Sequence, residues 1–447
     1  MTIKIGVKRL PKDPGPSAWN KILADAPSYP ELSADYTADW VIIGGGFAGL
    51  AAARRLTQLV PDDKVVLLEA IRLADGPAGR NSGFMIDLPH ELNSKSYAGG
   101  KESDLQQIKL NREAIKFAAE MAEEFEMPSS VFSYSGKVTA ASTVKGIKHL
   151  DNYSVHLESL GENYKWLDSS DMKSKTGSEF YQRGLYTSGA AMIQPAAFVR
   201  MAAQGLADKV SFHENSPVTN IVLGDEHIVE TPKAKVRAKN IILAVNGHIQ
   251  SFGFFEKRLL HVFTYASLTR ALTENEVKTL GGEQNWGILP ADPMGTTVRR
   301  FVGASGESRI LIRNHATLNQ SLEASSSNMK RAAAMQDVSF EDRFPNLPSV
   351  EMEYRWGGRL CLSLNSVPAF GEVEKRVWSA CCQNGLGTVK GTLSGMMAAE
   401  QAVLGRSPLL DEFKQHQEPR LLPPEPFLSF GANATMRWKE WLAGKEI

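Results

Sequence analysis

The sequence predicts a mixed fold in which a doubly wound α/β domain is interrupted by an α+β domain. The α/β domain is predicted by an apolar run, a glycine turn and a helical pattern at 41–59, and by short buried runs at 240–245 and 377–382. The α+β domain is predicted because alternating segments mixed with helical ones fill 133–189 and 286–320. A chain of 447 residues is also long enough for two or three domain-sized units.

A strand–turn–helix unit near the N-terminus carries the clearest local signal. The apolar run 41–43 is typical of a buried parallel strand, and Gly44, Gly46 and Gly49 follow it in G-x-G-x-x-G spacing. Such glycines permit a tight turn, close approach of a pyrophosphate and close helix–strand packing. Glu69 stands about 20 residues further on, where an acid accepts hydrogen bonds from ribose hydroxyls. The unit predicts a dinucleotide site; the alternative is an ordinary strand, turn and helix.

Composition excludes several classes of protein. Fifty basic and fifty acidic residues cancel, so no global field favours nucleic acid as a partner. No run of about 18 apolar residues predicts a membrane span, and the N-terminus lacks the apolar core of a secretion signal. The three cysteines have no metal-ligand spacing and suit a reducing compartment. We therefore expect a cytoplasmic protein without a bound metal.

Patterning along the chain suggests a discontinuous domain arrangement. Residues 1–37 are rich in proline and predict an irregular arm that lies over the surface; alternatively, Trp19 and Tyr29 cover part of an active site. A helix is expected at 102–127 from its apolar spacing. The boundaries that we expect are an arm at 1–37, a cofactor domain at 38–95, 190–257 and 345–410, a substrate domain at 96–189 and 258–344, and a tail at 411–447.

Two glycine-rich loops narrow the choice of dinucleotide. The loop at 76–83 follows the fingerprint closely, and its glycines would permit close approach of the backbone to a planar ligand. A second turn, 384–388, precedes a helix at about 388–404, whose N-terminus would suit negative charge. An NAD-binding protein has no particular need for the first loop, whereas a protein that holds an isoalloxazine ring does.

Eight motifs in order resemble the D-amino-acid-oxidase-like family of FAD-dependent oxidoreductases, and within it the γ-glutamylputrescine oxidoreductase branch. They are 41–50, 68–70, 78–83, 216–221, 242–247, 356–358, 368–371 and 384–387, and the resemblance spans roughly residues 20–405. It implies a Rossmann-type, glutathione-reductase-like FAD domain with an interleaved substrate domain on a mixed or antiparallel sheet. It also implies FAD held without a covalent bond.

The resemblance carries FAD contacts onto specific positions. Those expected around the pyrophosphate and adenosine are Gly44, Gly46, Phe47, Ala48, Gly49, Glu69, Ala70 and Val218. Those expected around the isoalloxazine and its pyrimidine edge are Arg80, Asn81, Ser82, Gly83, Gly385, Leu386, Gly387 and Thr388. Further positions expected to contact FAD are Asn246, Gly247, Gly358 and Asn384. The helix that follows Thr388 would direct its positive end at the flavin O2 and so raise the redox potential.

The chemistry implied by the resemblance is oxidation of a C–N bond in an amine or amino-acid derivative. A hydride passes to flavin N5, the resulting imine is hydrolysed, and O2 or another acceptor takes up the electrons. Two alternatives stay open: an FAD-binding protein with a ligand-binding or regulatory role, and a flavoenzyme that acts on modified RNA nucleosides. The balanced charge disfavours the latter.

The substrate half is less defined. The candidate catalytic residues are Arg80, Lys390, His261 and Tyr265, and further candidates to line the site are His90, His248 and Trp286. Where amino-acid-oxidising relatives place a carboxylate-binding arginine, this chain has Leu360. Arg359 is one residue away and on a strand would face the other side, so we expect it at the surface or between domains. Cys361 is expected to be a buried thiol rather than a flavin tether.

Overall fold

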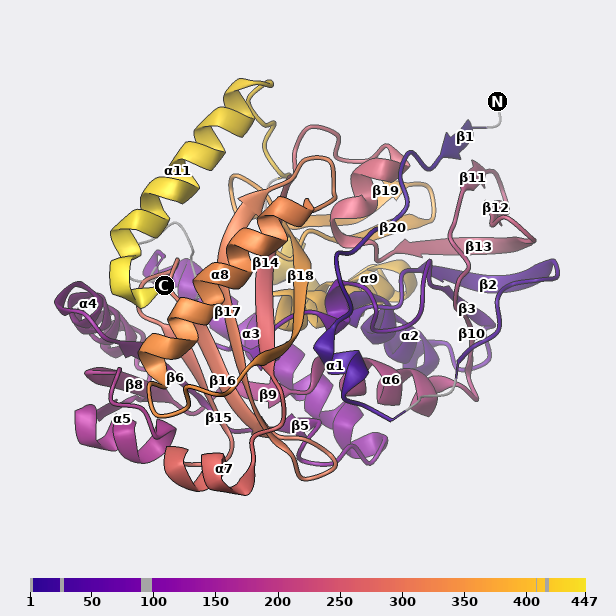
Figure 1. Ribbon diagram of the computed structural model, residues 1–447. Helices are drawn as coiled ribbons and strands as arrows, with labels where there is room; N and C mark the ends of the chain where they lie inside the picture. The colour runs from indigo at the N-terminus through magenta and orange to yellow at the C-terminus, as the bar shows by residue number, and fades with distance from the viewer. Residues whose placement is uncertain (1–2, 25–27, 90–98, 407, 415–417) are drawn as a thin grey trace.

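The computed structural model describes residues 3–24, 28–89, 99–406, 408–414 and 418–447. Two large sheets organise the chain (Figure 1). The predicted dinucleotide unit lies at the centre of the first sheet, where β2 (Tyr36–Ile43) pairs in parallel with β3 (Val65–Leu68) on one side and β13 (Lys235–Leu243) on the other.

Within the described residues, the first sheet comprises nine strands. Parallel pairing continues from β3 to β10 (Val210–His213) and from β13 to β20 (Val377–Cys381), which itself pairs antiparallel with β19 (Ala369–Glu374). The other edge is antiparallel and consists of β12 (His227–Glu230), β11 (Asn220–Leu223) and β1 (Ile3–Gly6). The buried runs at 41–43, 240–245 and 377–382 belong to β2, β13 and β20, which are neighbours in this sheet. They are apolar throughout because both faces of a parallel sheet are normally covered.

Helices cover the first sheet. The helix of the glycine turn, α2 (Phe47–Leu59), packs on α9 (Gly387–Leu404), although hundreds of residues separate them in the chain. The other helices on this side are α6 (Pro195–Leu206), α3 (Lys101–Glu124) and α10 (Pro408–Lys414). Because α3 contacts α9 and α6, it lies with the cofactor half, whereas we expected it in the substrate domain.

The second sheet has eight strands in the order β18-β14-β17-β16-β15-β6-β8-β7. Their bounds are β18 (Met352–Leu362), β14 (Leu260–Thr269), β17 (Ser308–Leu318), β16 (Thr297–Val302), β15 (Trp286–Pro290), β6 (Lys137–Ala141), β8 (Arg183–Thr187) and β7 (Lys165–Leu167). β18 was expected in the cofactor domain, but its long antiparallel pairing with β14 places it in this sheet. α8 (Ser326–Arg343) packs on one face of β14, β17 and β18 (Figure 1).

The remaining elements connect these layers. They are α1 (Ala18–Lys21), α4 (Val144–Leu160), α5 (Ser169–Thr176), α7 (Glu274–Leu280), the short sheet β4 (Phe84–Met85), β9 (Ala191–Ile193) and β5 (Phe132–Ser133), and the 3₁₀ turns at 77–79, 246–252 and 444–446. The chain ends in α11 (Phe427–Ala443), which packs on β17. None of the described helices is long and apolar enough to cross a membrane.

The N-terminal arm is part of the fold rather than a surface strap. Its β1 extends the first sheet, and Trp19 of α1 is fully buried. The Trp19 ring lies 4.9 Å from the Phe301 ring, and its indole N–H donates to the Asn81 carbonyl at 2.7 Å. Tyr29 packs on Phe212 instead of covering a site. The arm therefore fastens the loop that carries Asn81 to the second sheet.

Candidate functional site

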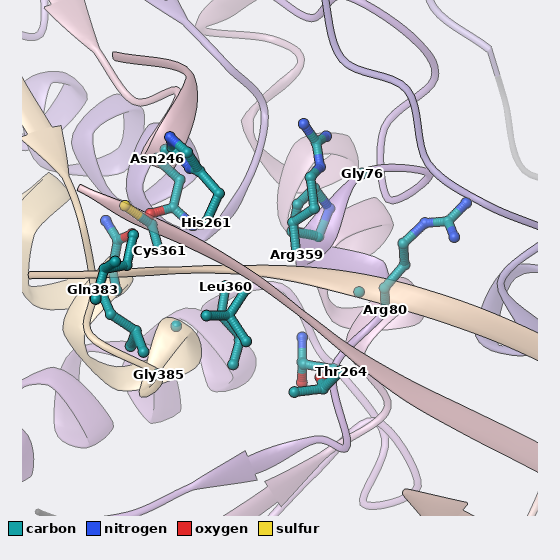
Figure 2. A pocket seen from close by; sticks show the side chains of 18 of the residues that line it. Gly76, Arg80, Asn246, His261, Thr264, Arg359, Leu360, Cys361, Gln383 and Gly385 are labelled. Carbon is teal, nitrogen blue, oxygen red and sulfur yellow. The ribbon is translucent and has the colours of Figure 1, made fainter. Parts of the chain in front are cut away.

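One cavity of about 700 Å³ lies between the two sheets, a size in the usual range for small-molecule sites. Its walls include the β2–α2 turn, the loop at 76–82, the segment just after β13, parts of β14 and β18, and the start of α9. Figure 2 looks into it: Leu360 and Cys361 of β18 lie between Gln383, just ahead of α9, and Thr264 of β14. The cavity thus joins segments from both predicted domains.

The β2–α2 turn forms one end of the cavity. Gly44 has a φ of +105°, and a Cβ there would lie 2.6 Å from the Ala244 carbonyl oxygen, so no other residue fits. A Cβ on Gly49 would overlap the Gly44 carbonyl oxygen, which explains why Gly49 packs the helix on its strand without lining the cavity. Gly46 is the N-cap and offers no side-chain hydrogen bond, so the N–H groups of the first turn of α2 are available to an anion.

Glu69 lies at the end of β3 beside this turn. Its carboxylate accepts hydrogen bonds from the N–H groups of Gly45 (2.8 Å) and Ile71 (3.2 Å). Burial raises its pKa, and these N–H groups act in the opposite direction. Ala70 and Val218 continue the wall from Glu69. The structure therefore brings the residues expected for pyrophosphate and adenosine to one end of the cavity.

Arg80 lies at the cavity wall, but its guanidinium is turned outwards. It donates to the carbonyl oxygens of Asp75 (2.6 Å), Pro14 (3.0 Å), Gly15 (2.9 Å) and Gly357 (3.0 Å). Burial lowers its pKa, which nearby aspartates partly counteract. Through these hydrogen bonds the guanidinium of Arg80 links the loop at 76–83 to the N-terminal arm and to β18. We expected Arg80 to act in catalysis, but its guanidinium is bound to backbone carbonyl groups and has a structural role.

The rest of the loop at 76–83 is braced by its own hydrogen bonds. Asn81 and Ser82 line the cavity, and the Asn81 side chain bridges the Ala78 carbonyl (2.7 Å) and the Gly83 N–H (2.8 Å). Gly83 does not line the cavity; a Cβ there would collide with the Arg299 guanidinium. Burial lowers the pKa of Arg299 to about 10, and the side chain donates to the carbonyls of Ser82 (3.2 Å) and Ile193 (2.5 Å).

The turn before α9 supplies the facing wall. Gly385, Leu386, Gly387 and Thr388 all line the cavity, and α9 begins without a side-chain cap. Asn384 does not line it: its side-chain oxygen accepts from the Ser363 N–H at 2.8 Å and braces β18. Lys390 was expected near the reacting atoms, but it is absent from the lining, since its helical position turns it away while Gly391 faces inwards.

Alternation along β14 decides which of its residues face the cavity. Val262, Thr264 and Ala266 line it, whereas Tyr265 projects from the opposite face, where it is buried and its hydroxyl lies 2.7 Å from Thr317 Oγ1. The expected catalytic role of Tyr265 is corrected for this reason. Trp286 is buried in the core of the second sheet and does not line the cavity either.

Two histidines border the cavity. The pKa of His248 is lowered to about 3 and that of His261 to about 4, mainly by desolvation and in addition by the nearby charges of Arg359 and Arg9. Both imidazoles are therefore neutral at neutral pH. Of the two positions expected for Arg359, the surface is excluded, because the side chain is buried and lines the cavity. It forms a two-pronged ion pair with Asp13 of the arm, with both distances 2.9 Å, and also contacts His248. His90 lies outside the described residues.

Several atoms in the cavity wall fit an FAD molecule. Asn246 Oδ1 and His261 Nδ1 are buried and have no hydrogen-bond partner within the described residues. Gly247 lies beside His261, and Gly358, next to Arg80, also lines the cavity. Unpaired buried polar atoms are rare unless a ligand or water satisfies them. Together with two uncapped helix starts and Glu69, they match the polar groups of a dinucleotide. Cys361 also lines this wall, but burial raises the pKa of its thiol well above the usual value, which disfavours the nucleophilic thiolate.

The C-terminal helix α11 closes the other end of the cavity, although residues 411–447 were expected to form only a tail. Its inner face contributes Leu428, Ala432, Met436 and Lys439 to the lining. The spacing of four between the first three of these positions could have indicated a packed helix. Glu440 anchors the helix, since it accepts from Arg437 (2.7 Å) and lies 2.7 Å from the Nδ1 atom of His315.

A bulge in β17 makes this anchor possible. β14 pairs Thr264 with Ala316 and the next residue, Tyr265, with Asn314, so His315 is an extra residue with a φ of +60°. Beyond the bulge, Arg313 pairs with Ala266 on one side and Thr297 on the other, and all three line the cavity. Sequence analysis did not identify Arg313 or Lys439.

Comparisons with known proteins agree with this geometry. A family model described as FAD dependent oxidoreductase matches residues 39–401. The probable oxidoreductase OrdL of Haemophilus influenzae is 25% identical over 396 residues, with 86% of this chain and 87% of that protein covered. The gamma-glutamylputrescine oxidoreductase of Escherichia coli is 24% identical over 380 residues, with 83% and 84% covered.

Solved structures show the same fold. The crystal structure of glycine oxidase from Geobacillus kaustophilus matches with a TM-score of 0.68 at 15% identity, over 86% of this chain and 99% of that one. L-proline dehydrogenase from P. horikoshii matches with a TM-score of 0.64 at 14% identity, over 85% and 98%. These matches confirm the predicted fold class.

Proposed function

Since the chain belongs to the family of FAD-dependent oxidoreductases, we propose that it oxidises the C–N bond of an amine that also carries an anionic group. Its cofactor is FAD, as in the family. We assign the nucleotide to the cavity end formed by the β2–α2 turn and Glu69, and the flavin to the walls formed by the loop at 76–82 and the turn at 385–388. FAD held there supplies a two-electron acceptor for a hydride from the carbon next to nitrogen.

The charge of the lining carries the proposal for the substrate. Among the described residues that line the cavity, Glu69 is the single carboxylate, and it belongs to the nucleotide end. The other end receives Arg313 from β17 and Lys439 from α11. An anionic group on the substrate would pair with these cations by charge-assisted hydrogen bonds. They stand on different elements from Leu360, where relatives that oxidise amino acids are expected to have arginine.

The same charges favour the reactive form of the amine. Nearby cations disfavour an ammonium ion and so lower the pKa of a bound amine. A neutral amine has the lone pair that assists departure of the hydride, and the resulting imine is hydrolysed to a carbonyl compound and an amine. His261, neutral at neutral pH, offers a hydrogen-bond partner in this cavity. The apolar inner face of α11 restricts water.

The likeness to a gamma-glutamylputrescine oxidoreductase supports an amine substrate. An anaerobic titration of the yellow protein tests the proposal, with polyamines, γ-glutamyl amines, N-methyl amino acids and D-amino acids, each carboxylate paired with its carboxamide. We expect loss of the flavin band at about 450 nm with anionic amines, and much less with their carboxamides. A protein that retains FAD yet is reduced by no amine would contradict the proposal and favour a binding role.

A further inference from the structure

The outer face of α11 exposes large apolar side chains. Phe427 is 73% exposed, Phe430 80%, Trp438 60% and Trp441 75%. Steps of three and four residues along a helix place these four side chains on one side, with Ala434 between them. In Figure 1 the helix runs along the edge of the molecule. Contiguous exposed aromatic side chains of this kind mark an interaction surface.

The opposite face of α11 is firmly docked, so the exposed face is not a consequence of a loose helix. Leu428 is buried and Met436 is partly buried at the cavity, and Glu440 binds His315 and Arg437. Beyond the helix, Glu446 accepts from the N–H groups of Ser142 (2.9 Å) and Thr143 (3.0 Å) at the start of α4.

These contacts leave the outer face apolar and cationic. Both acids of the segment 427–447, Glu440 and Glu446, are buried and paired inwards. Lys445, just beyond the helix, is exposed, whereas Lys439 belongs to the inner face at the cavity. Glu425, which precedes the helix, accepts from the Ser429 N–H at 3.1 Å and so belongs to the start of the helix.

We propose that the outer face of α11 docks the protein on the surface of a membrane that contains anionic lipids. Exposed Trp and Phe on one side of a helix with cations at its flank is the pattern of a helix that lies in the lipid interface. Anionic headgroups complement Lys445 at the end of this face. A second copy of the same face fits less well, since two surfaces that carry only cations repel each other.

Docking in this orientation places the cavity beside the lipid. Phe427 belongs to both surfaces: it is exposed on the outer face and also lines the cavity. One helix therefore closes the cavity on its inner side and contacts lipid on its outer side. This inference does not depend on the substrate or the reaction, and its test uses no turnover.

The test measures binding of the flavin-loaded protein to vesicles by co-sedimentation. The vesicles contain phosphatidylcholine alone or mixed with phosphatidylglycerol, with brominated lipid added in a parallel series. We expect binding to the anionic vesicles, weaker binding at high salt, and quenching of tryptophan fluorescence by bromine. The double variant Phe430→Ser/Trp441→Ser should bind at least about tenfold more weakly, because it removes two interfacial aromatic rings.

Variants and association measurements decide the outcome. The control is the double variant Leu105→Ser/Tyr134→Ser, which replaces two exposed apolar side chains far from α11 in the sequence, one in α3 and one just after β5. It should bind vesicles as the wild type does. Lys445→Glu should weaken binding to anionic vesicles only. Absence of binding by the wild type would overturn the proposal, as would binding that survives in Phe430→Ser/Trp441→Ser. A dimer in sedimentation equilibrium that Trp441→Ser dissociates, without vesicle binding, would instead identify a second copy as the partner.

Discussion

The two ends of the cavity differ in how far apart in the sequence the residues that form their walls are. At the nucleotide end, the β2–α2 turn and Glu69 fall within one short stretch, and the backbone N–H groups at the uncapped start of α2 are available to an anion. At the substrate end, β14, β17 and α11 contribute side chains from distant segments. The first end depends on glycines that permit close backbone approach, and the second depends on charge and on the docking of α11.

The largest effect is expected at the nucleotide end. Gly49→Ala should abolish recovery of flavin-loaded protein, because its Cβ would overlap the Gly44 carbonyl oxygen and neither backbone can yield without separating α2 from β2. FAD content per chain after purification, read from absorbance, measures this. If Gly49→Ala protein held a full complement of FAD, the close packing assigned to this turn would be wrong.

A second expected effect is a pH dependence of the unfolding free energy that arises from His261, which lies between the two ends of the cavity. His261 has its folded-state pKa lowered to about 4, below the roughly 6.5 of an unfolded chain. The unfolded state therefore binds more protons between about pH 6.5 and pH 4, and the unfolding free energy falls as pH falls through that window. For His261 the full loss is about 3 kcal/mol.

His248, whose pKa is lowered to about 3, acts in the same direction. Urea unfolding of the flavin-loaded protein at several pH values should show this slope, and His261→Asn should reduce it. An identical slope in the wild type and the variant would mean that His261 titrates normally.

A smaller effect is expected at Glu69. Glu69→Gln keeps the shape but removes the charge that the N–H groups of Gly45 and Ile71 stabilise beside the ribose position. The dissociation constant for FAD should rise about tenfold, measured by titrating apoprotein with fluorescent FAD. Asp62→Asn, on the exposed turn after α2, serves as the control and should bind FAD as the wild type does.

The smallest effect is expected at the substrate end, where the space around Gly431 would accommodate a larger side chain. Gly431 lies in α11, and a Cβ there would have no atom within 4 Å. Gly431→Ala should raise the free energy of unfolding by up to about 1 kcal/mol through helix propensity, with FAD content unchanged. Thermal unfolding measures it. A strong loss of stability would show that α11 approaches its neighbours more closely than described.

The contrast between the ends also explains what the sequence could predict. The strand, turn and helix at 41–59 and Glu69 are local, so spacing alone placed them correctly along the cavity. The orientation of Arg80 depends on its contacts with the N-terminal arm, and that of Tyr265 on the face of β14 that packs against α8. The orientation of Lys390 depends on which face of α9 is turned towards the cavity. No local pattern carries that information.

The remaining omissions have the same origin. The bulge at His315 becomes visible only through the pairing of β17 with β14, and it decides how α11 is anchored. Arg313 faces the cavity because of its register with Ala266 and Thr297. Lys439 reaches the cavity only because α11 folds back on the second sheet. Sequence spacing cannot supply contacts between segments that tertiary packing alone brings together.

The central claim is that FAD and the anionic part of the amine are held at opposite ends of one cavity by independent groups. Anaerobic reduction of the flavin in the double variant Arg313→Leu/Lys439→Leu tests it most directly. We predict full FAD content, at least about tenfold weaker half-saturation by an anionic amine, and unchanged reduction by the matched carboxamide. Equal losses for both amines, or loss of FAD itself, would contradict the account.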